Sequence, residues 1–217
     1  MKKHQCVLFD LDGVIVDTAK YHYQSWKKIA NTFDYNLTHK DNEQLKGVSR
    51  TDSLKAILKM ANINEESIDF EFLLIEKNQS YLTLVQSVTP LDVLPGIMTG
   101  LDFFKEKEVK IGLGSASKNA QIILEKLKIT SYFEVVIDGN QVLKGKPDPE
   151  VFLKGSFALN IAPEYCLVFE DSAVGIKAAK AASMTAVALG EPSDFSGADF
   201  CYPDFSYIDK NILNKMV

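Results

Sequence analysis

Short, wholly apolar stretches that stop at polar residues constrain the fold of this 217-residue chain more than any other feature. The stretch Cys6-Val7-Leu8-Phe9 ends at Asp10, and similar runs occupy residues 109–113, 135–137, 166–169 and 185–189. Continuous apolarity is typical of a strand buried on both faces. Between these runs, apolar residues recur at helical spacing, as at Ala120, Ile123, Leu124 and Leu127. The alternation predicts an α/β fold with a doubly wound, Rossmann-like parallel sheet.

Residues 17–88 interrupt this alternation and have a helical pattern almost throughout. One apolar face combines Trp26, Ile29, Ala30 and Phe33, a second combines Leu54, Ile57, Leu58 and Ala61, and a third runs through residues 72–85. We expect Thr51, Asp52 or Ser53 to cap the second helix. The sequence therefore predicts an α/β catalytic core domain, residues 1–16 and 89–217, with an inserted all-helical cap domain, residues 17–88.

Composition narrows the class of partner. The net charge of −5 disfavours nucleic acid, which needs a basic surface. Apolar runs are shorter than the roughly 18 residues that a membrane span needs, and the N-terminal apolar stretch is too short for a signal peptide. We therefore expect a cytoplasmic protein without a membrane partner, and we expect a monomer. Cys6, Cys166 and Cys201 fit no zinc pattern and are interpreted as small buried hydrophobes.

Four polar groups follow the apolar runs or lie in loops between them. They are Asp10-Leu11-Asp12-Gly13, Ser115-Ala116-Ser117, Lys146-Pro147 and Glu170-Asp171. Ligands of open parallel sheets bind beyond the carboxyl ends of the strands, so these groups can meet at one place. Clustered carboxylates need a cation, and oxygen ligands suit Mg²⁺. A hydroxyl and an ammonium would complete a phosphate site, and an aspartate can itself attack phosphorus.

Each group also has a structural interpretation when taken alone. Asp10-Leu11-Asp12 could form a turn, and Lys146-Pro147-Asp148-Pro149 could be a surface turn. Glu170-Asp171-Ser172 and Ser115-Ala116-Ser117 could cap the helices that follow them. The occurrence of all four in this order favours a shared site for phosphoryl transfer.

The same residues resemble the four motifs of the haloacid dehalogenase superfamily. The matching segments are Phe9 to Val14, Gly114 to Ser117, Gly145 to Pro149 and Phe169 to Ser172. The resemblance implies that Asp10 is the nucleophile and Asp12 the general acid and base. It implies magnesium bound by Asp10, the backbone carbonyl of Asp12, and Asp171, with Glu170 close by. Ser115 and Lys146 would hold the transferring phosphoryl group.

The helical segment is similar to that of the β-phosphoglucomutase family within this superfamily. The resemblance covers Asp17-Thr18-Ala19, Tyr21-His22, Trp26, Leu45 to Arg50, Ser53 and Lys77-Asn78, and in the core Ser117-Lys118-Asn119. It implies a substrate and phosphate site formed by Thr18, His22, Trp26, Lys46, Gly47, Val48, Arg50, Ser53, Lys77, Ser115, Ala116, Ser117, Lys118, Asn119 and Lys146. By themselves, His22 could be a surface histidine, Trp26 a packing residue and Lys46 a solvated charge. Residues 32–42 and the tail from Glu191 carry no resemblance.

The expected function is the interconversion of β-D-glucose 1-phosphate and glucose 6-phosphate. The resemblance implies a phosphorylated Asp10 and a β-glucose 1,6-bisphosphate intermediate. The physical argument is that Arg50, with Lys118 and Asn119, can hold a second phosphate. Three alternatives remain: a sugar-phosphate phosphatase, a signalling receiver domain, and a binding protein without catalysis. The helical segment and Arg50 disfavour the receiver domain, and the full set of catalytic residue types disfavours the last.

Overall fold

Within residues 4–217, which the computed structural model describes, six parallel strands form one sheet in the order β3-β2-β1-β4-β5-β6. They are β1 (Cys6–Phe9), β2 (Lys110–Gly114), β3 (Val135–Ile137), β4 (Cys166–Glu170), β5 (Thr185–Leu189) and β6 (Phe200–Tyr202). Cys6 pairs with Lys110 on one side and with Cys166 on the other, so β1 is central. The strand order reverses beside β1, which is where open α/β sheets bind ligands. The predicted sheet is confirmed.

Side chains alternate along each strand and produce an apolar layer on each face of the sheet. On β1, Val7 and Phe9 pack into one buried cluster, whereas Cys6 and Leu8 pack into the other. The helices α5 (Ile97–Glu106), α6 (Ala120–Leu127) and α9 (Lys210–Met216) cover the first face. The helices α7 (Glu150–Leu159) and α8 (Ala173–Ala181) cover the second. Coverage of both faces explains why the strands are apolar throughout.

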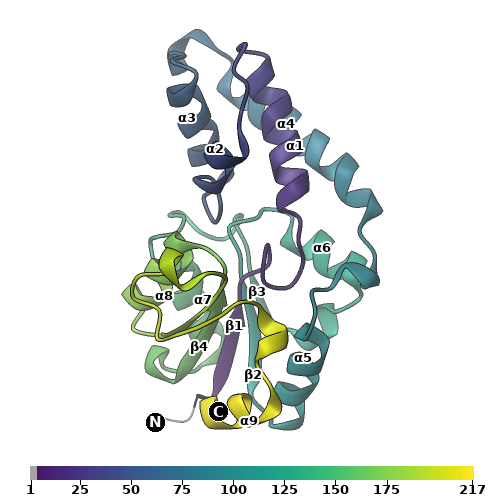
Figure 1. Cartoon of the computed structure of the whole chain (residues 1–217), viewed down its shortest axis with the longest axis vertical. Helices are drawn as coiled ribbons and strands as arrows, with labels where there is room; N and C mark the ends of the chain where they lie inside the picture. The colour runs from purple at the N-terminus through teal and green to yellow at the C-terminus, as the bar shows by residue number, and fades with distance from the viewer. Residues whose placement is uncertain (1–3) are drawn as a thin grey trace.

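Four helices lie beyond the carboxyl ends of the strands, on the side of the sheet away from the C-terminus (Figure 1). They are α1 (Ala19–Asn31), α2 (His39–Glu43), α3 (Arg50–Met60) and α4 (Phe70–Leu84). We call them the helical insertion. They enclose an apolar cluster of their own, in which Trp26, Ile29, Leu54 and Ile57 are buried. This separate cluster supports the proposed division into a core domain and a cap domain.

The structure corrects two details of the sequence interpretation. Ser49 caps α3, because its hydroxyl accepts a hydrogen bond from the Asp52 amide, so the expected cap at Thr51, Asp52 or Ser53 is wrong. Cys6 and Cys166 are buried as expected, but Cys201 is only partly buried on the edge strand β6. No helix between residues 4 and 217 combines the length and apolarity that a membrane crossing requires.

The tail, for which the sequence offered no resemblance, closes one face of the core. The Phe205 ring is buried and lies 4.9 Å from the Phe169 ring centroid and 6.0 Å from that of Phe9. A Cβ atom on Gly100 would overlap the Phe205 ring, so a glycine of α5 makes room for it.

We therefore predict that Phe205→Ala lowers the free energy of unfolding by about 3–5 kcal/mol, because it leaves a cavity between packed rings. Tyr207→Ala is the matched control, since its side chain is exposed, and should change stability by no more than about 0.5 kcal/mol. Urea unfolding followed by circular dichroism measures both. Equal effects of the two substitutions would contradict a packing role for the tail.

Candidate active site

Asp10 lies at the carboxyl end of the central strand. Its backbone amide donates to the Phe169 carbonyl at 2.9 Å, which continues the pairing of β1 with β4 by one residue. The chain then turns tightly at Gly13, where φ is +83° and a Cβ atom would overlap the Asp171 carboxylate. Only glycine tolerates that conformation at so close an approach. The turn therefore places Asp10 and Asp171 side by side.

Lys146 connects the loop before α7 to this point. Its Nζ atom lies 2.5 Å from Asp10 Oδ1 and 2.5 Å from Glu170 Oε1, and its side chain is 1% exposed. Burial lowers the pKa of Lys146, but the two carboxylates outweigh burial and raise it above its usual value. Glu170 is held in turn by the amide and hydroxyl of Ser172 at 2.7 and 2.9 Å. The segment from Lys146 to Pro149 forms a turn, as its structural interpretation expected, and Pro147 is exposed, but the Lys146 side chain is buried in the site.

Asp10, Glu170 and Asp171 form the acidic group that could bind a metal ion. Carboxylate oxygens of the three residues lie within 4.8 Å of one another. Burial, with help from neighbouring carboxylates, raises the pKa of Asp10 to about 7 and that of Asp171 well above its usual value. Lys146 contacts Asp10 and Glu170, and the ammonium of Lys46 lies near enough to Asp171 to oppose the rise of its pKa, so three carboxylates meet two ammonium groups. This excess of negative charge and the all-oxygen donor set fit a hard divalent cation such as Mg²⁺.

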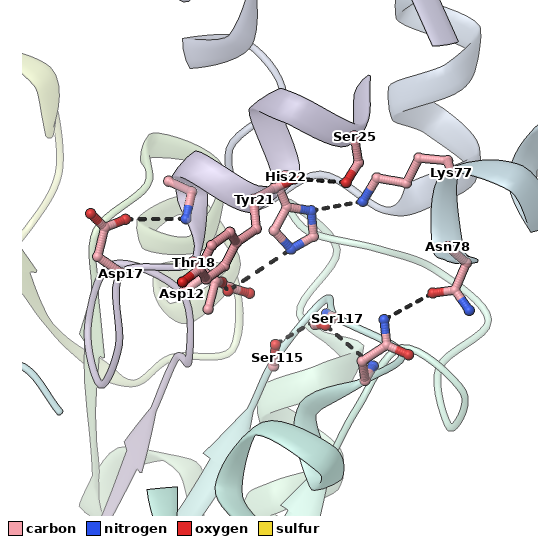
Figure 2. Close-up of polar contacts among 12 residues, drawn as sticks. Asp12, Asp17, Thr18, Tyr21, His22, Ser25, Lys77, Asn78, Ser115 and Ser117 are labelled. Carbon is pink, nitrogen blue, oxygen red and sulfur yellow. Dashed lines mark hydrogen bonds and ion pairs between the residues drawn. The ribbon is translucent and has the colours of Figure 1, made fainter. Parts of the chain in front are cut away.

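The Asp12 carboxylate lies outside that group and faces the helical insertion (Figure 2). The Thr18 hydroxyl donates to Asp12 Oδ1, and His22 Nε2 lies 3.9 Å from the same oxygen. Lys77 Nζ lies 2.9 Å from His22 Nδ1, on the other side of the imidazole. An ammonium can only donate, so a charged Lys77 places the acceptor on Nδ1 and the proton on Nε2, which has no hydrogen-bond partner among residues 4–217. The interpretation of His22 as an ordinary surface histidine is wrong.

The pKa values of Asp12 and Lys77 shift toward neutrality, whereas that of His22 shifts away from it. Burial raises the pKa of Asp12 to about 7, although Lys77 and Lys146 oppose the rise. Burial and the nearby Arg50 lower the pKa of Lys77 to about 7, against the attraction of Asp12. Burial and Lys77 hold the pKa of His22 well below its usual range. A carboxyl group that titrates near pH 7 can both give and take a proton at neutral pH.

The loop after β2 forms the opposite wall. The Ser115 hydroxyl accepts from the Ser117 amide at 3.0 Å, and the Ser117 hydroxyl accepts from the Asn119 amide at 3.2 Å. The cap position of α6 is Asn119, so the interpretation of Ser115-Ala116-Ser117 as the helix cap is wrong. Ser172 does cap α8, by accepting from the Gly175 amide, while Glu170 remains in the acidic group.

A pocket between the helical insertion and the sheet collects most of the predicted residues. Its lining comprises Asp10, Asp12, Ala19, His22, Trp26, Asn42, Leu45, Lys46, Gly47, Val48, Arg50, Ser53, Lys77, Ser115, Ala116, Ser117, Lys118, Asn119 and Asp171. Thr18, Lys146 and Glu170, also predicted, are buried behind this lining. Sequence reasoning missed Ala19, Asn42 and Leu45. Ala19 and Leu45 lie inside the resembling segments, whereas Asn42 ends the unmatched stretch and gave no signal.

Charge is distributed unevenly along the pocket. The floor is acidic at Asp10 and Asp171, whereas Arg50 and Lys118 lie together at the other end, where both also line a neighbouring cleft. Among residues 4–217, neither Arg50 nor Lys118 forms an ion pair. Unpaired cations facing a pocket are suited to bind an anion of the ligand.

Three remaining residues occupy mixed positions. Trp26 is buried in the helical insertion and also lines the pocket, with Lys77 Nζ 4.8 Å from its ring centroid. Lys46 lies 2.8 Å from Glu43 and remains partly exposed at the pocket. Gly47 has φ +70°, and a Cβ atom there would overlap the Ser172 hydroxyl. This glycine lets the helical insertion contact the core directly beside the acidic group.

We predict that Lys77→Met makes the protein more stable at pH 7, by on the order of 2 kcal/mol, while impairing activity. The folded pKa of Lys77, about 7, is below its unfolded value, so unfolding binds a proton between about pH 7 and 10.5. The cost of burying the charged lysine is complete below that window and disappears as the pH rises through it. The stability advantage of Lys77→Met should therefore shrink between pH 7 and 10.

Thermal unfolding of both proteins across this pH range measures the difference. Lys55→Met is the control, because Lys55 is exposed on α3, and its effect should not depend on pH in this window. A constant difference between Lys77→Met and the unsubstituted protein would contradict the cost of burying this lysine in its charged form.

Comparison with known proteins shows which family and which relatives this chain resembles. The family described as haloacid dehalogenase-like hydrolase matches residues 7–189. A β-phosphoglucomutase of Bacillus subtilis is 40% identical over 213 residues, which is 97% of this chain and 94% of the relative. A crystal structure of a β-phosphoglucomutase from Clostridium difficile superposes with a TM-score of 0.94 at 36% identity, covering 98% of this chain and 96% of that one.

Another relative is named as a phosphatase. The phosphorylated carbohydrates phosphatase of Thermotoga maritima is 30% identical over 182 residues, which is 83% of this chain and 82% of the relative. The match to the family model, the identities and the shared architecture agree with the four motifs around Asp10. The chain belongs to the haloacid dehalogenase-like hydrolase family.

Proposed function

We propose that this protein is a β-phosphoglucomutase, which interconverts β-D-glucose 1-phosphate and glucose 6-phosphate. The observation that carries the proposal is the separation of charge along the pocket, with the acidic group at the floor and Arg50 and Lys118 at the other end. A sugar that can carry phosphate at two positions needs one site for the reacting phosphate and a second site that binds the phosphate that does not react. The similarity to β-phosphoglucomutases over nearly the whole chain supports the same conclusion.

In the proposed cycle, the phosphorylated carboxylate of Asp10 faces the 6-hydroxyl of β-glucose 1-phosphate. Asp12 takes the hydroxyl proton as the sugar oxygen attacks phosphorus, and the bond between phosphorus and the Asp10 oxygen breaks. The product is β-glucose 1,6-bisphosphate and a free Asp10. After the bisphosphate has turned end for end, Asp10 attacks the phosphorus of the C1 phosphate, the bond from that phosphorus to the oxygen on C1 breaks, and Asp12 returns its proton to this oxygen. Glucose 6-phosphate is then released, and Asp10 is again phosphorylated.

The surrounding residues prepare these groups. The Thr18 hydroxyl fixes one oxygen of Asp12, and the neutral His22 directs its Nε2 proton toward that oxygen. Lys146, which contacts Asp10, is placed to hold the phosphoryl group while it is bound to Asp10. Ser115 lines the same pocket as Asp10. We propose that Asp10, Asp171, the Asp12 carbonyl and the nearby Glu170 hold Mg²⁺. When bound, the ion would neutralise the phosphoryl oxygens that develop charge.

Phosphoryl transfer to water is the second candidate function, favoured by the phosphatase among the relatives. A hydrolase has no need of a second anion site, whereas Arg50 and Lys118 provide one. Binding energy from the distal phosphate can hold the helical insertion against the core and exclude water from the phosphorylated Asp10.

We also propose that one chain acts alone, since residues of a single chain complete the pocket, and that it acts in the cytoplasm, where phosphorylated sugars are retained.

We predict that the purified protein, given β-glucose 1-phosphate, Mg²⁺ and a trace of β-glucose 1,6-bisphosphate, accumulates glucose 6-phosphate with little free phosphate. Asp10→Asn should lower turnover by at least about a thousandfold, because it removes the nucleophile. Asp34→Asn is the control, since Asp34 is exposed beyond the end of α1. Coupled assays for glucose 6-phosphate and phosphate read both products. Persistent turnover by Asp10→Asn would contradict its role, and stoichiometric phosphate release would favour the hydrolase.

A second substitution tests the distal grip. Arg50→Ala should raise KM for β-glucose 1-phosphate about 10- to 100-fold and increase the share of product released as phosphate, because it removes a charged hydrogen-bond donor from the ligand. Lys55→Ala, an exposed position on the same helix, should leave both quantities unchanged. Unchanged KM in Arg50→Ala would place the second phosphate elsewhere.

A further inference from the structure

A hydrogen bond between two asparagine side chains joins the helical insertion to the loop after β2, residues 115–119, which we call the phosphate loop. Asn119 Nδ2 donates to Asn78 Oδ1 at 3.0 Å (Figure 2). Asn119 occupies the N-cap position of α6, where asparagine ordinarily accepts a hydrogen bond from its own helix. Here its side chain makes no capping bond and turns to α4 instead. The usual stabilisation of the helix end is replaced by a contact with the helical insertion.

Asn78 has no local reason to be an asparagine. It lies in the middle of α4, where asparagine is a weaker helix former than alanine. Its partner Asn119 is only 7% exposed, so the bond is shielded from solvent on that side. The next residue, Gln79, is exposed and its side chain forms no hydrogen bond among those described for residues 4–217. The tertiary contact therefore distinguishes Asn78 from its neighbour.

The residue before Asn78 contacts the acid–base group. Lys77 bonds to His22, which faces Asp12, so consecutive residues of α4 contact the two ends of the pocket. A shift of α4 relative to the core would move both contacts together. A movement of the phosphate loop that shifts α4 would therefore also shift Lys77 and, through it, His22.

We propose that Asn78 is a positioning residue for the distal phosphate, a role that rests on the proposed function. Its carbonyl oxygen holds one N–H of the Asn119 amide, which fixes the amide plane and leaves the second N–H free for a phosphate oxygen. An amide that is already oriented loses less rotational freedom when the ligand binds. The same bond holds α4, and with it Lys77, against the core when the distal phosphate is in place.

A double-mutant cycle tests the proposal in the full chain. Asn78→Ala should raise KM for β-glucose 1-phosphate about three- to tenfold, the worth of one neutral hydrogen bond, with kcat within about twofold. In the Asn119→Ala background the same substitution should change KM by less than about 1.5-fold, because Asn78 acts through Asn119. Thr83→Ala, at an exposed position of the same helix that lines neither the pocket nor the neighbouring cleft, is the control and should match the unsubstituted protein.

A second readout does not depend on turnover. Trp26 is the chain's single tryptophan and lines the pocket, so glucose 6-phosphate binding can be followed by its fluorescence. The Kd should follow the same cycle as KM. Asn78→Asp keeps the acceptor but places a carboxylate beside the phosphate loop, so it should weaken binding more than Asn78→Ala. The melting temperature of each variant separates this effect from unfolding.

Two results would overturn the inference. One is an unchanged KM and Kd in both Asn78 variants. The other is an Asn78→Ala effect of equal size with and without Asn119, which would show that Asn78 acts independently. If the unsubstituted protein released phosphate and formed no glucose 6-phosphate, the proposed mutase function would fail. The cycle would still be measured, from KM for that hydrolysis and from fluorescence.

Discussion

The buried ion pairs of Lys146 are the interaction on which the site depends. Carboxylates at the ends of two neighbouring strands, Asp10 and Glu170, would repel one another without a cation, and the lysine lies 2.5 Å from each. Removing one partner from such a buried cluster leaves an uncompensated charge, which is strongly destabilising. The third carboxylate, Asp171, joins Asp10 and Glu170 in an acidic group that could bind a metal ion. The residues that hold the ends of β1 and β4 together are thus also the ones suited to bind a hard cation.

The helical insertion adds selectivity to this floor. It supplies Thr18, His22 and Lys77, which orient Asp12, and Arg50, which faces the pocket without an acidic partner. The core therefore supplies the acidic group and Lys146, whereas the insertion supplies Arg50 and the groups around Asp12, and both parts line the pocket.

Sequence predicted the features that depend on local pattern. The central strands are continuous apolar runs, and the polar residues at their ends predicted that Asp10, Ser115 and the Glu170-Asp171 pair would meet at one place. The structure brings the oxygens of Asp10, Glu170 and Asp171 within 4.8 Å of one another and places Asp10, Asp171 and Ser115 in one pocket. The edge strand β6 was not predicted as part of the sheet, although Phe200-Cys201-Tyr202 is apolar, because three partly buried residues around Cys201 do not by themselves distinguish a strand from a loop. Asn42 and the bond from Asn119 to Asn78 were also missed, because they arise from how helices pack, which leaves no periodic signal in the sequence.

The central claim is that the phosphoryl group on Asp10 returns to a sugar. The most direct measurement loads the enzyme with labelled phosphate from β-glucose 1,6-bisphosphate and then adds unlabelled β-glucose 1-phosphate in a single turnover. The account predicts that the label leaves Asp10 in a sugar phosphate, faster than it appears as free phosphate when no sugar is added. Recovery of the label as inorganic phosphate at the same rate with and without the sugar would contradict it.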